Sequence, residues 1–118
     1  YERLSAKDNT RIFGDSFKIT EDAVEQIGNN VVLEYENMNF SEGFHKIIIC
    51  GRSHIDRNTI HVRFHGENGD INQIVEFPYS DEYIEKEFTL DSVEGNQKVA
   101  LVFLPGSNFD LKWFRFKR

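Results

Sequence analysis

Four carboxylates lie within seven residues of the chain, at Asp81, Glu82, Glu85 and Glu87. Glycoside hydrolysis needs two carboxyl groups at a defined separation, so such a group is a candidate for that chemistry. Glu85 and Glu87, however, alternate with apolar residues, which is typical of the solvent face of a strand. The chain also lacks a G-x-S-x-G elbow, an H-E-x-x-H pair and a phosphate-binding glycine loop. The sequence therefore predicts no catalytic centre.

His61 and His65 are four residues apart, a spacing that would present two metal ligands on one face of a helix. In "TIHVRFHG" the apolar residues alternate with polar ones, which predicts a strand. At roughly 3.3 Å per residue the two imidazoles then stand about 13 Å apart, too far to share a metal ion. Cys50 is the only cysteine, so no internal disulfide forms, and its apolar neighbours predict a buried thiol that packs as a small hydrophobe.

A third group combines aromatic and polar residues at turn positions: Tyr79, Tyr83, Asn108 and Asp110. Sugar rings present an apolar face and a rim of hydroxyls, which suit an aromatic ring together with amides or carboxylates. Two alternatives stay open. The tyrosines either stack on a sugar or close the end of the fold, and Asp110 either accepts bonds from a ligand or caps its own loop.

Short strands with turns between them make up most of the chain. Runs such as "QIVEF" and "KVALVFL" are rich in β-branched and aromatic residues, and turn signals such as "GENGD" and "LPGSN" separate them. Only "TEDAVEQIG" has any helical character, of one turn at most. About eight or nine strands at even spacing predict one all-β domain over residues 1–118, an antiparallel β-sandwich.

The net charge of −6 argues against partners that carry many phosphates, because nucleic acids and anionic membranes attract clustered Lys and Arg. The longest apolar run, residues 99–104, is far shorter than a membrane span. We expect the chain to be a module excised from a larger protein. The sequence favours no particular cellular compartment for that protein.

Beyond these patterns, "GSNFDLKWFRF" (residues 106–116) resembles the closing strand of family 6 carbohydrate-binding modules, typically Gly-Ser-Gly-Phe-Asn-(Leu/Ile)-Asp-Trp-Phe. "VVLEYENMNF" and "VALVFL" resemble two further strands of that family. "ICGRSHIDRNTIHVRF" followed by "FLPGSNFDLKWFRF" is similar to the C-terminal module of bacterial glycoside hydrolase family 2 enzymes, chiefly β-galactosidases. The resemblance implies a jelly roll, and a parent enzyme that is cytoplasmic or cell-associated.

In sugar-binding members of the family, two aromatics sandwich a sugar ring and an Asn hydrogen-bonds it. By resemblance, Asp110 takes the place of the Asn and Tyr83 that of one aromatic. We expect Asn108, Tyr79 or Gln26 to complete the rim of the site. The second aromatic falls near Gln26 or Ile27, neither of which is aromatic, so half of the sandwich is missing. The family's structural calcium site falls on Ser5, Lys7 and Lys112, and ammonium groups do not coordinate a hard cation. We therefore expect no bound calcium and no other cofactor.

Two functions follow from the resemblance. The first is a non-catalytic module that binds a glycan, with galactose-containing glycans as the candidates, and holds it near the catalytic domains of the same chain. The second is a structural module that supports those domains or a dimer contact and binds no sugar. Exposure of Tyr79 and Tyr83 around a pocket with Asp110 would favour the first.

Overall fold

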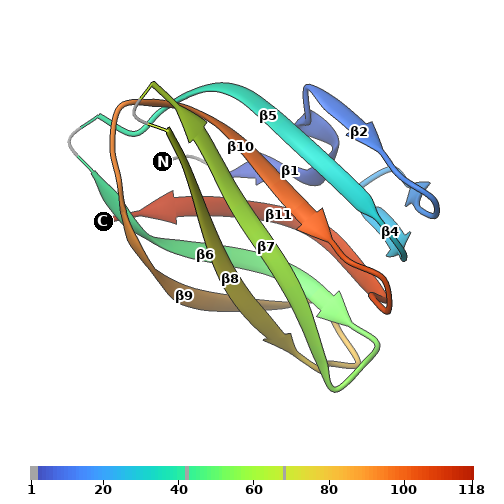
Figure 1. Cartoon of the computed structure of the whole chain (residues 1–118). Coiled ribbons are helices and arrows are strands. Elements are labelled where there is room, and N and C mark those ends of the chain that lie inside the picture. The colour runs from blue at the N-terminus through green and yellow to red at the C-terminus, as the bar shows by residue number, and fades with distance from the viewer. Residues whose placement is uncertain (1–2, 42, 68) are drawn as a thin grey trace.

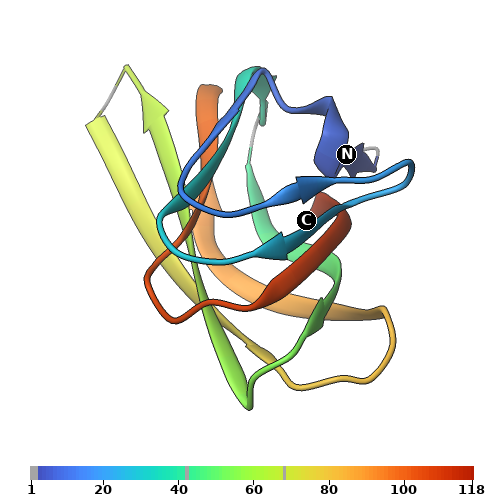
Figure 2. The ribbon, with the colours of Figure 1, turned by 90° about the vertical axis from the view of Figure 1, so that its right-hand side faces the viewer.

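The computed structural model describes residues 3–41, 43–67 and 69–118 as two antiparallel sheets packed face to face (Figure 1). One sheet has the order β3-β4-β11-β6-β9, with β1 also paired to β11, and the other has the order β2-β5-β10-β7-β8. We call them sheet A and sheet B. Figure 2 shows the two layers from the side. The antiparallel sandwich predicted from the strand pattern is confirmed.

Eleven strands and one short 3-10 helix lie in the described residues, more strands than the sequence suggested. The elements are β1 (Leu4–Ser5), η1 (Ala6–Asp8), β2 (Arg11–Phe13), β3 (Lys18–Ile19), β4 (Val24–Ile27), β5 (Val31–Asn39), β6 (Phe44–Ser53), β7 (Arg57–Gly66), β8 (Gly69–Pro78), β9 (Ile84–Val93), β10 (Asn96–Phe103) and β11 (Phe109–Lys117). The segment with helical character, residues 20–28, instead contains strand β4. Pairing with β3 and β11 supplies hydrogen bonds that one isolated helical turn could not retain.

Period-two alternation places the apolar side chains of each sheet between the layers. In β7, Ile60, Val62 and Phe64 are fully buried while His61 and Arg63 lie on the outer face. The two ends of the chain meet in sheet A, where Leu4 of β1 pairs with Phe114 of β11. The first and last strands of the domain are therefore neighbours in sheet A.

One end of the core sits directly beneath the loops that precede β7, β9 and β11. Phe109 is fully buried there, with its ring centroid 5.0 Å from Phe77 and 5.6 Å from Phe103. Gly51 faces this ring, and a Cβ added at Gly51 would clash with it. A glycine in β6 thus lets the first residue of β11 pack deeply, which sets the position of the residue that follows.

Cys50 is buried, as predicted, with 7% of its surface exposed. It lies on the outer side of sheet A, however, and not between the sheets. It pairs with Trp113 and Glu85 across the neighbouring strands. Burial raises the pKa of the thiol, and the negative charge of Glu85 adds to that effect. We expect a mild thiol reagent at pH 7.5 to leave the folded protein unmodified and to label Cys50 rapidly only in denaturant. Stoichiometric labelling of the folded protein within minutes would contradict this burial.

Candidate functional site

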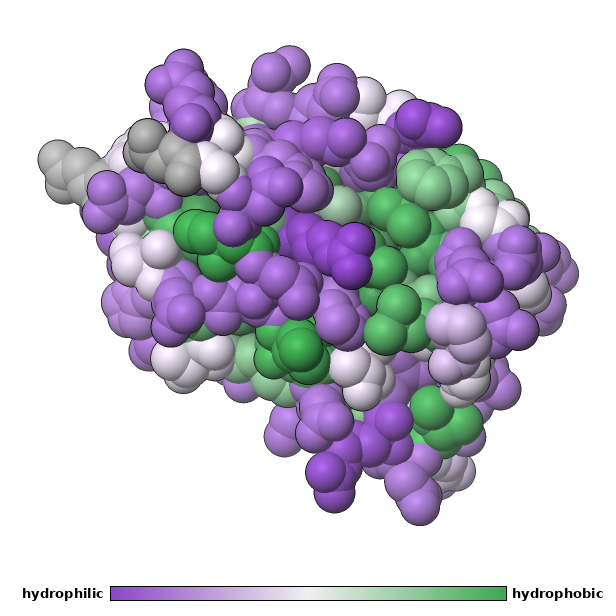
Figure 3. Space-filling view, viewed as in Figure 1, coloured by the Kyte–Doolittle hydropathy of each residue, from purple (hydrophilic) through white to green (hydrophobic). Residues whose placement is uncertain are grey.

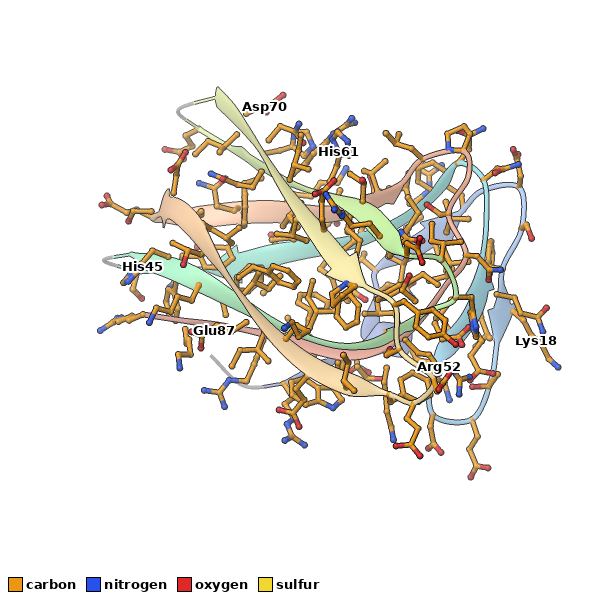
Figure 4. The ribbon with its side chains drawn as sticks, turned by 90° about the horizontal axis from the view of Figure 1, so that it is seen from below. Lys18, His45, Arg52, His61, Asp70 and Glu87 are labelled. Atoms are coloured by element: carbon orange, nitrogen blue, oxygen red, sulfur yellow. The ribbon has the colours of Figure 1, made fainter. Side chains whose placement is uncertain are left out.

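Asp110 lies between β4 and β6 near the start of β11, at the end of the sandwich that carries Arg52 (Figure 4). Because Phe109 and Leu111 point into the core, alternation turns the Asp110 side chain to the outer side of sheet A. A bulge in the pairing of β11 with β4 brings the amide of Gln26 toward the carboxylate. Gln26 has φ +54°, an uncommon conformation for a residue other than glycine.

The Asp110 carboxylate is only 2% exposed and accepts hydrogen bonds from three residues. Oδ1 accepts from the backbone N–H of Gln26 at 2.9 Å. Oδ2 accepts from Nε and Nη2 of Arg52, each at 2.8 Å, and lies 2.7 Å from Nε2 of His54. Burial alone would raise the pKa of Asp110, but the bonds from Gln26, His54 and Arg52 outweigh it and the pKa is lowered.

Neither role that the sequence suggested for Asp110 describes this arrangement. Both of its oxygens are engaged by protein groups, so Asp110 is not an open acceptor facing a ligand. Its donors do not come from its own loop either, since Gln26, His54 and Arg52 are at least 56 residues away in the chain. The carboxylate instead ties β4, β6 and β11 together and holds the Arg52 and His54 side chains in place.

Tyr83 lies beside this network, half-buried, just before β9. Its hydroxyl donates to Oε2 of Glu25 at 2.7 Å, and burial together with this bond raises its pKa. The guanidinium of Arg52 lies over the ring at 4.7 Å from the centroid, and the ammonium of Lys112 lies at 5.5 Å. The Tyr83 ring, which was expected to stack on a sugar, is therefore already in contact with these two cations.

Tyr79, by contrast, is 54% exposed at the end of β8. Its hydroxyl donates to Asp81, and its backbone N–H donates to the carbonyl of Asp56 at 3.1 Å. Tyr79 does not line the hollow described next, so the structure does not bring the two tyrosines together around Asp110.

An open hollow of about 360 Å³ lies above the Asp110 network. It is lined by Glu25, Gln26, Arg52, His54, Asn108 and Asp110. A second hollow of about 350 Å³ adjoins it and shares Gln26 and Asn108. The structure thus brings together three of the expected residues, Gln26, Asn108 and Asp110.

Three residues of the hollow were missed by the sequence analysis: Glu25, Arg52 and His54. Each lies on a strand or turn whose partner in the sheet is far away in the chain, so no local spacing connects it with Asp110. His54, for example, follows β6, whereas its partner Asp110 lies on β11, 56 residues further along the chain.

His61, His65 and Glu87 form surface contacts, as expected for solvent-facing strands. His61 Nδ1 lies 3.2 Å from Nδ2 of Asn72, and His65 Nδ1 lies 2.9 Å from Oδ1 of Asp70. Glu87 pairs with Lys117 at 2.8 Å. Among the described residues, no group of three His, Cys, Asp or Glu side chains is placed to hold a metal ion.

The residues that the sequence resemblance places at a calcium site do not fit a calcium ion. The ammonium of Lys7 donates to the backbone carbonyl of Glu21 at 2.6 Å, which joins η1 to the turn before β4. A carbonyl oxygen that would suit calcium is therefore bound by a positive side chain of the protein itself.

We expect the melting temperature to be the same, within 1 °C, in 5 mM calcium and in excess chelator. Lys7→Met removes the ammonium and should lower the melting temperature by a few degrees, whereas Lys18→Met on the exposed β3 should not. A rise of several degrees on adding calcium to the wild type would show that a cation site exists after all.

No protein-family model matches the chain, and no curated protein matches it by sequence. Solved structures match it over its whole length. A family 6 carbohydrate-binding module from Clostridium cellulolyticum, in complex with xylose, superposes with a TM-score of 0.84, covering 100% of this chain and 98% of that one at 22% identity. A β-1,3-glucan-binding module of family 6 from Bacillus halodurans gives 0.82, covering 100% and 96% at 20% identity. This chain has the fold of family 6 carbohydrate-binding modules.

The fold also occurs as one part of a larger enzyme. A family 43 arabinoxylan arabinofuranohydrolase from Bacillus subtilis, in complex with cellotetraose, matches all of this chain with 27% of its own length, at a TM-score of 0.79 and 21% identity. The jelly roll implied by the closing-strand motif agrees with these comparisons. No helix in the described part of the chain is long and apolar enough to span a membrane.

Proposed function

We propose that this domain is a non-catalytic carbohydrate-binding module and that its glycan occupies the hollow above Asp110. The observation that carries the proposal is the buried carboxylate under an open polar hollow. By holding Arg52 and His54, Asp110 prepares hydrogen-bonding groups at the rim before any ligand arrives. Such preorganisation reduces the entropy that binding costs.

The lining groups of the hollow suit a ring that carries several hydroxyls. The side-chain amides of Gln26 and Asn108 supply both donors and acceptors, and the Glu25 carboxylate supplies acceptors. No phenylalanine, tyrosine or tryptophan is among the described lining residues, so the sugar is recognised mainly by its hydroxyls. An open site of this kind should bind weakly, with a dissociation constant around 1 mM, or about 4 kcal/mol.

The solved relatives support this function and suggest ligands to test. The Clostridium cellulolyticum module was solved with xylose, and the Bacillus halodurans module binds β-1,3-glucan. The arabinofuranohydrolase supports the proposal that the parent chain is a glycoside hydrolase whose catalytic domains are the partner of this module. A β-galactosidase parent and a galactose-containing glycan follow from the sequence resemblance, so galactosides belong in the same panel.

Nuclear magnetic resonance titration with galactose, lactose, xylose, cellobiose and a β-1,3-glucan oligosaccharide tests the site. We expect at least one sugar to shift amides around Gln26, His54 and Asn108. Asn108→Ala should weaken that binding about tenfold, since a polar contact to the sugar is lost. Asn96→Ala makes the same change at the opposite end of β10 and should leave the affinity unchanged.

The structural alternative has a specific observation in its favour, because Arg52 covers the Tyr83 ring and the hollow lacks an aromatic platform. If no sugar in the panel shifts any amide at 20 mM, the glycan-binding proposal is wrong and the structural role is the better account. Shifts confined to another surface would also overturn the proposed site.

A further inference from the structure

The outer face of sheet B carries an ordered array of side chains that the proposed sugar site does not use. The registers of the four strand pairs place Phe13, Val32, Val102, His61 and Ile74 in one row across β2, β5, β10, β7 and β8. This row, called here the apolar row, has His61 as its only polar member. Phe13 is 39% exposed and Ile74 is 57% exposed, so both ends of the row are open to solvent. Figure 3 shows this face, with hydrophobic side chains distributed across it among hydrophilic ones.

The adjacent row, two residues along each strand, is polar except at its centre. It consists of Arg11, Glu34, Ala100, Arg63 and Asn72. We call it the charged row. Its middle strand is again β10, and Ala100 is small enough to let another surface approach closely. An acidic residue lies on one side of this alanine and a basic residue on the other.

We propose that a second copy of this chain docks face to face on sheet B, with the two-fold axis running along β10. Such an axis exchanges β5 with β7 and β2 with β8, because these strands flank β10 symmetrically. Glu34 of each copy then lies opposite Arg63 of the other. Phe13 lies opposite Ile74 in the same way, and Val102 lies opposite its own counterpart.

The complementarity of charge is what favours a second copy over an unrelated partner. Arg63 is half-buried and makes no ion pair within the described residues, whereas Glu34 lies 2.9 Å from Lys98. The Glu34 side chain is 14% exposed and keeps its bond to Lys98, so a facing Glu34 bridges Lys98 of its own copy and Arg63 of the other and supplies the acidic partner that Arg63 lacks within its own chain. The two-fold symmetry forms this ion pair twice, so one substitution in the chain changes two ion pairs in the dimer.

The size of the face limits how tight the dimer can be. Five strands at about 4.8 Å spacing give a face about 24 Å wide, so each copy buries several hundred Å² at most. Specific interfaces bury about 800 Å² per partner, so this interface is smaller than a standard one and of the weak, transient kind. We expect a dissociation constant on the order of 100 µM, and hence a monomer in dilute solution.

Sedimentation velocity from 10 µM to 1 mM, with and without a charge exchange, tests the proposal. Arg63→Glu alone places two glutamates opposite each other at both pairs and should raise the dimer dissociation constant at least tenfold. Glu34→Arg alone should do the same with two arginines. An equimolar mixture of the two variants restores an opposite-charge pair at both positions, and it should return to within threefold of the wild-type value. Glu87→Arg, on sheet A, is the matched control and should have no effect.

Recovery in the mixture shows that the single variants are folded, so misfolding cannot imitate the expected result. A wild-type chain that stays monomeric at 1 mM overturns the proposal, and so does a mixture that fails to associate. Sugar titrations that shift amides around Phe13 and Ile74 in a monomer would also overturn it, by making this face a ligand surface. None of these results depends on whether sugar binds above Asp110.

Discussion

Asp110→Ala should lower the free energy of unfolding by about 2–4 kcal/mol, which is roughly 10 °C in melting temperature for a domain of this size. The substitution leaves Arg52 with only the more distant Glu25 carboxylate, at 3.6 Å, and the turned amide of Gln26 without its acceptor. Breaking a fully buried ion pair costs more, but Arg52 and His54 are partly exposed, and water compensates them in part. Sugar binding should be lost as well, because the rim groups are no longer held in place.

Chemical denaturation at pH 7 measures this effect, with Asp81→Ala as the control because that carboxylate is exposed. We expect the control to change the free energy of unfolding by less than about 0.5 kcal/mol. If Asp110→Ala proved as stable as the control, the carboxylate would not be the tie between β4, β6 and β11 described above.

The same residue gives the stability a dependence on acid. Because the pKa of Asp110 is lowered in the folded state, its contribution is complete above the unfolded pKa of about 3.9 and is lost as the pH falls through the folded pKa. Asp110→Asn lacks this titration. The difference in stability between wild type and Asp110→Asn should therefore shrink as the pH falls below about 4. A difference that grew on acidification would contradict the direction of the pKa shift.

Phe109→Ala should cost about 3–5 kcal/mol, the usual range for truncating a buried phenylalanine. The ring is fully buried against Phe77 and Phe103, and Gly51 leaves no side chain that could fill the cavity. Loss of the ring also frees the start of β11, so Asp110 should lose its fixed position and sugar binding should weaken with stability.

Denaturant melts of Phe109→Ala and Phe109→Leu separate cavity formation from loss of the aromatic ring, and Phe109→Leu should retain more than half of the lost stability. Phe13→Ala, at an exposed position of β2, serves as the surface control. Equal effects of Phe109→Ala and Phe13→Ala on the melt would show that Phe109 is not part of the core that supports the site.

The site shows which of its residues a local sequence pattern can predict and which it cannot. Residues near the last turn, Asn108 and Asp110, were recognised because both lie in one short motif. Arg52 and His54 were not, because 56 or more residues separate them from Asp110 in the chain. The bulge at Gln26 was also invisible, since its φ depends on pairing with β11 and on the carboxylate that receives its amide.

The sequence by itself determined the all-β class and the inward-facing residues of strands such as β7. These follow from period-two alternation and turn residues, which act over a few positions of the chain. It also indicated that Cys50 is buried, although not on which side of the sheet. Only the tertiary structure decided what Asp110 does, because burial and hydrogen bonding depend on which strands lie side by side. The register of β4, β6 and β11 places the Asp110 carboxylate beneath the hollow, where it links the three strands instead of accepting bonds from a ligand. A buried carboxylate surrounded by three donor residues is most stable when it accepts hydrogen bonds from all of them.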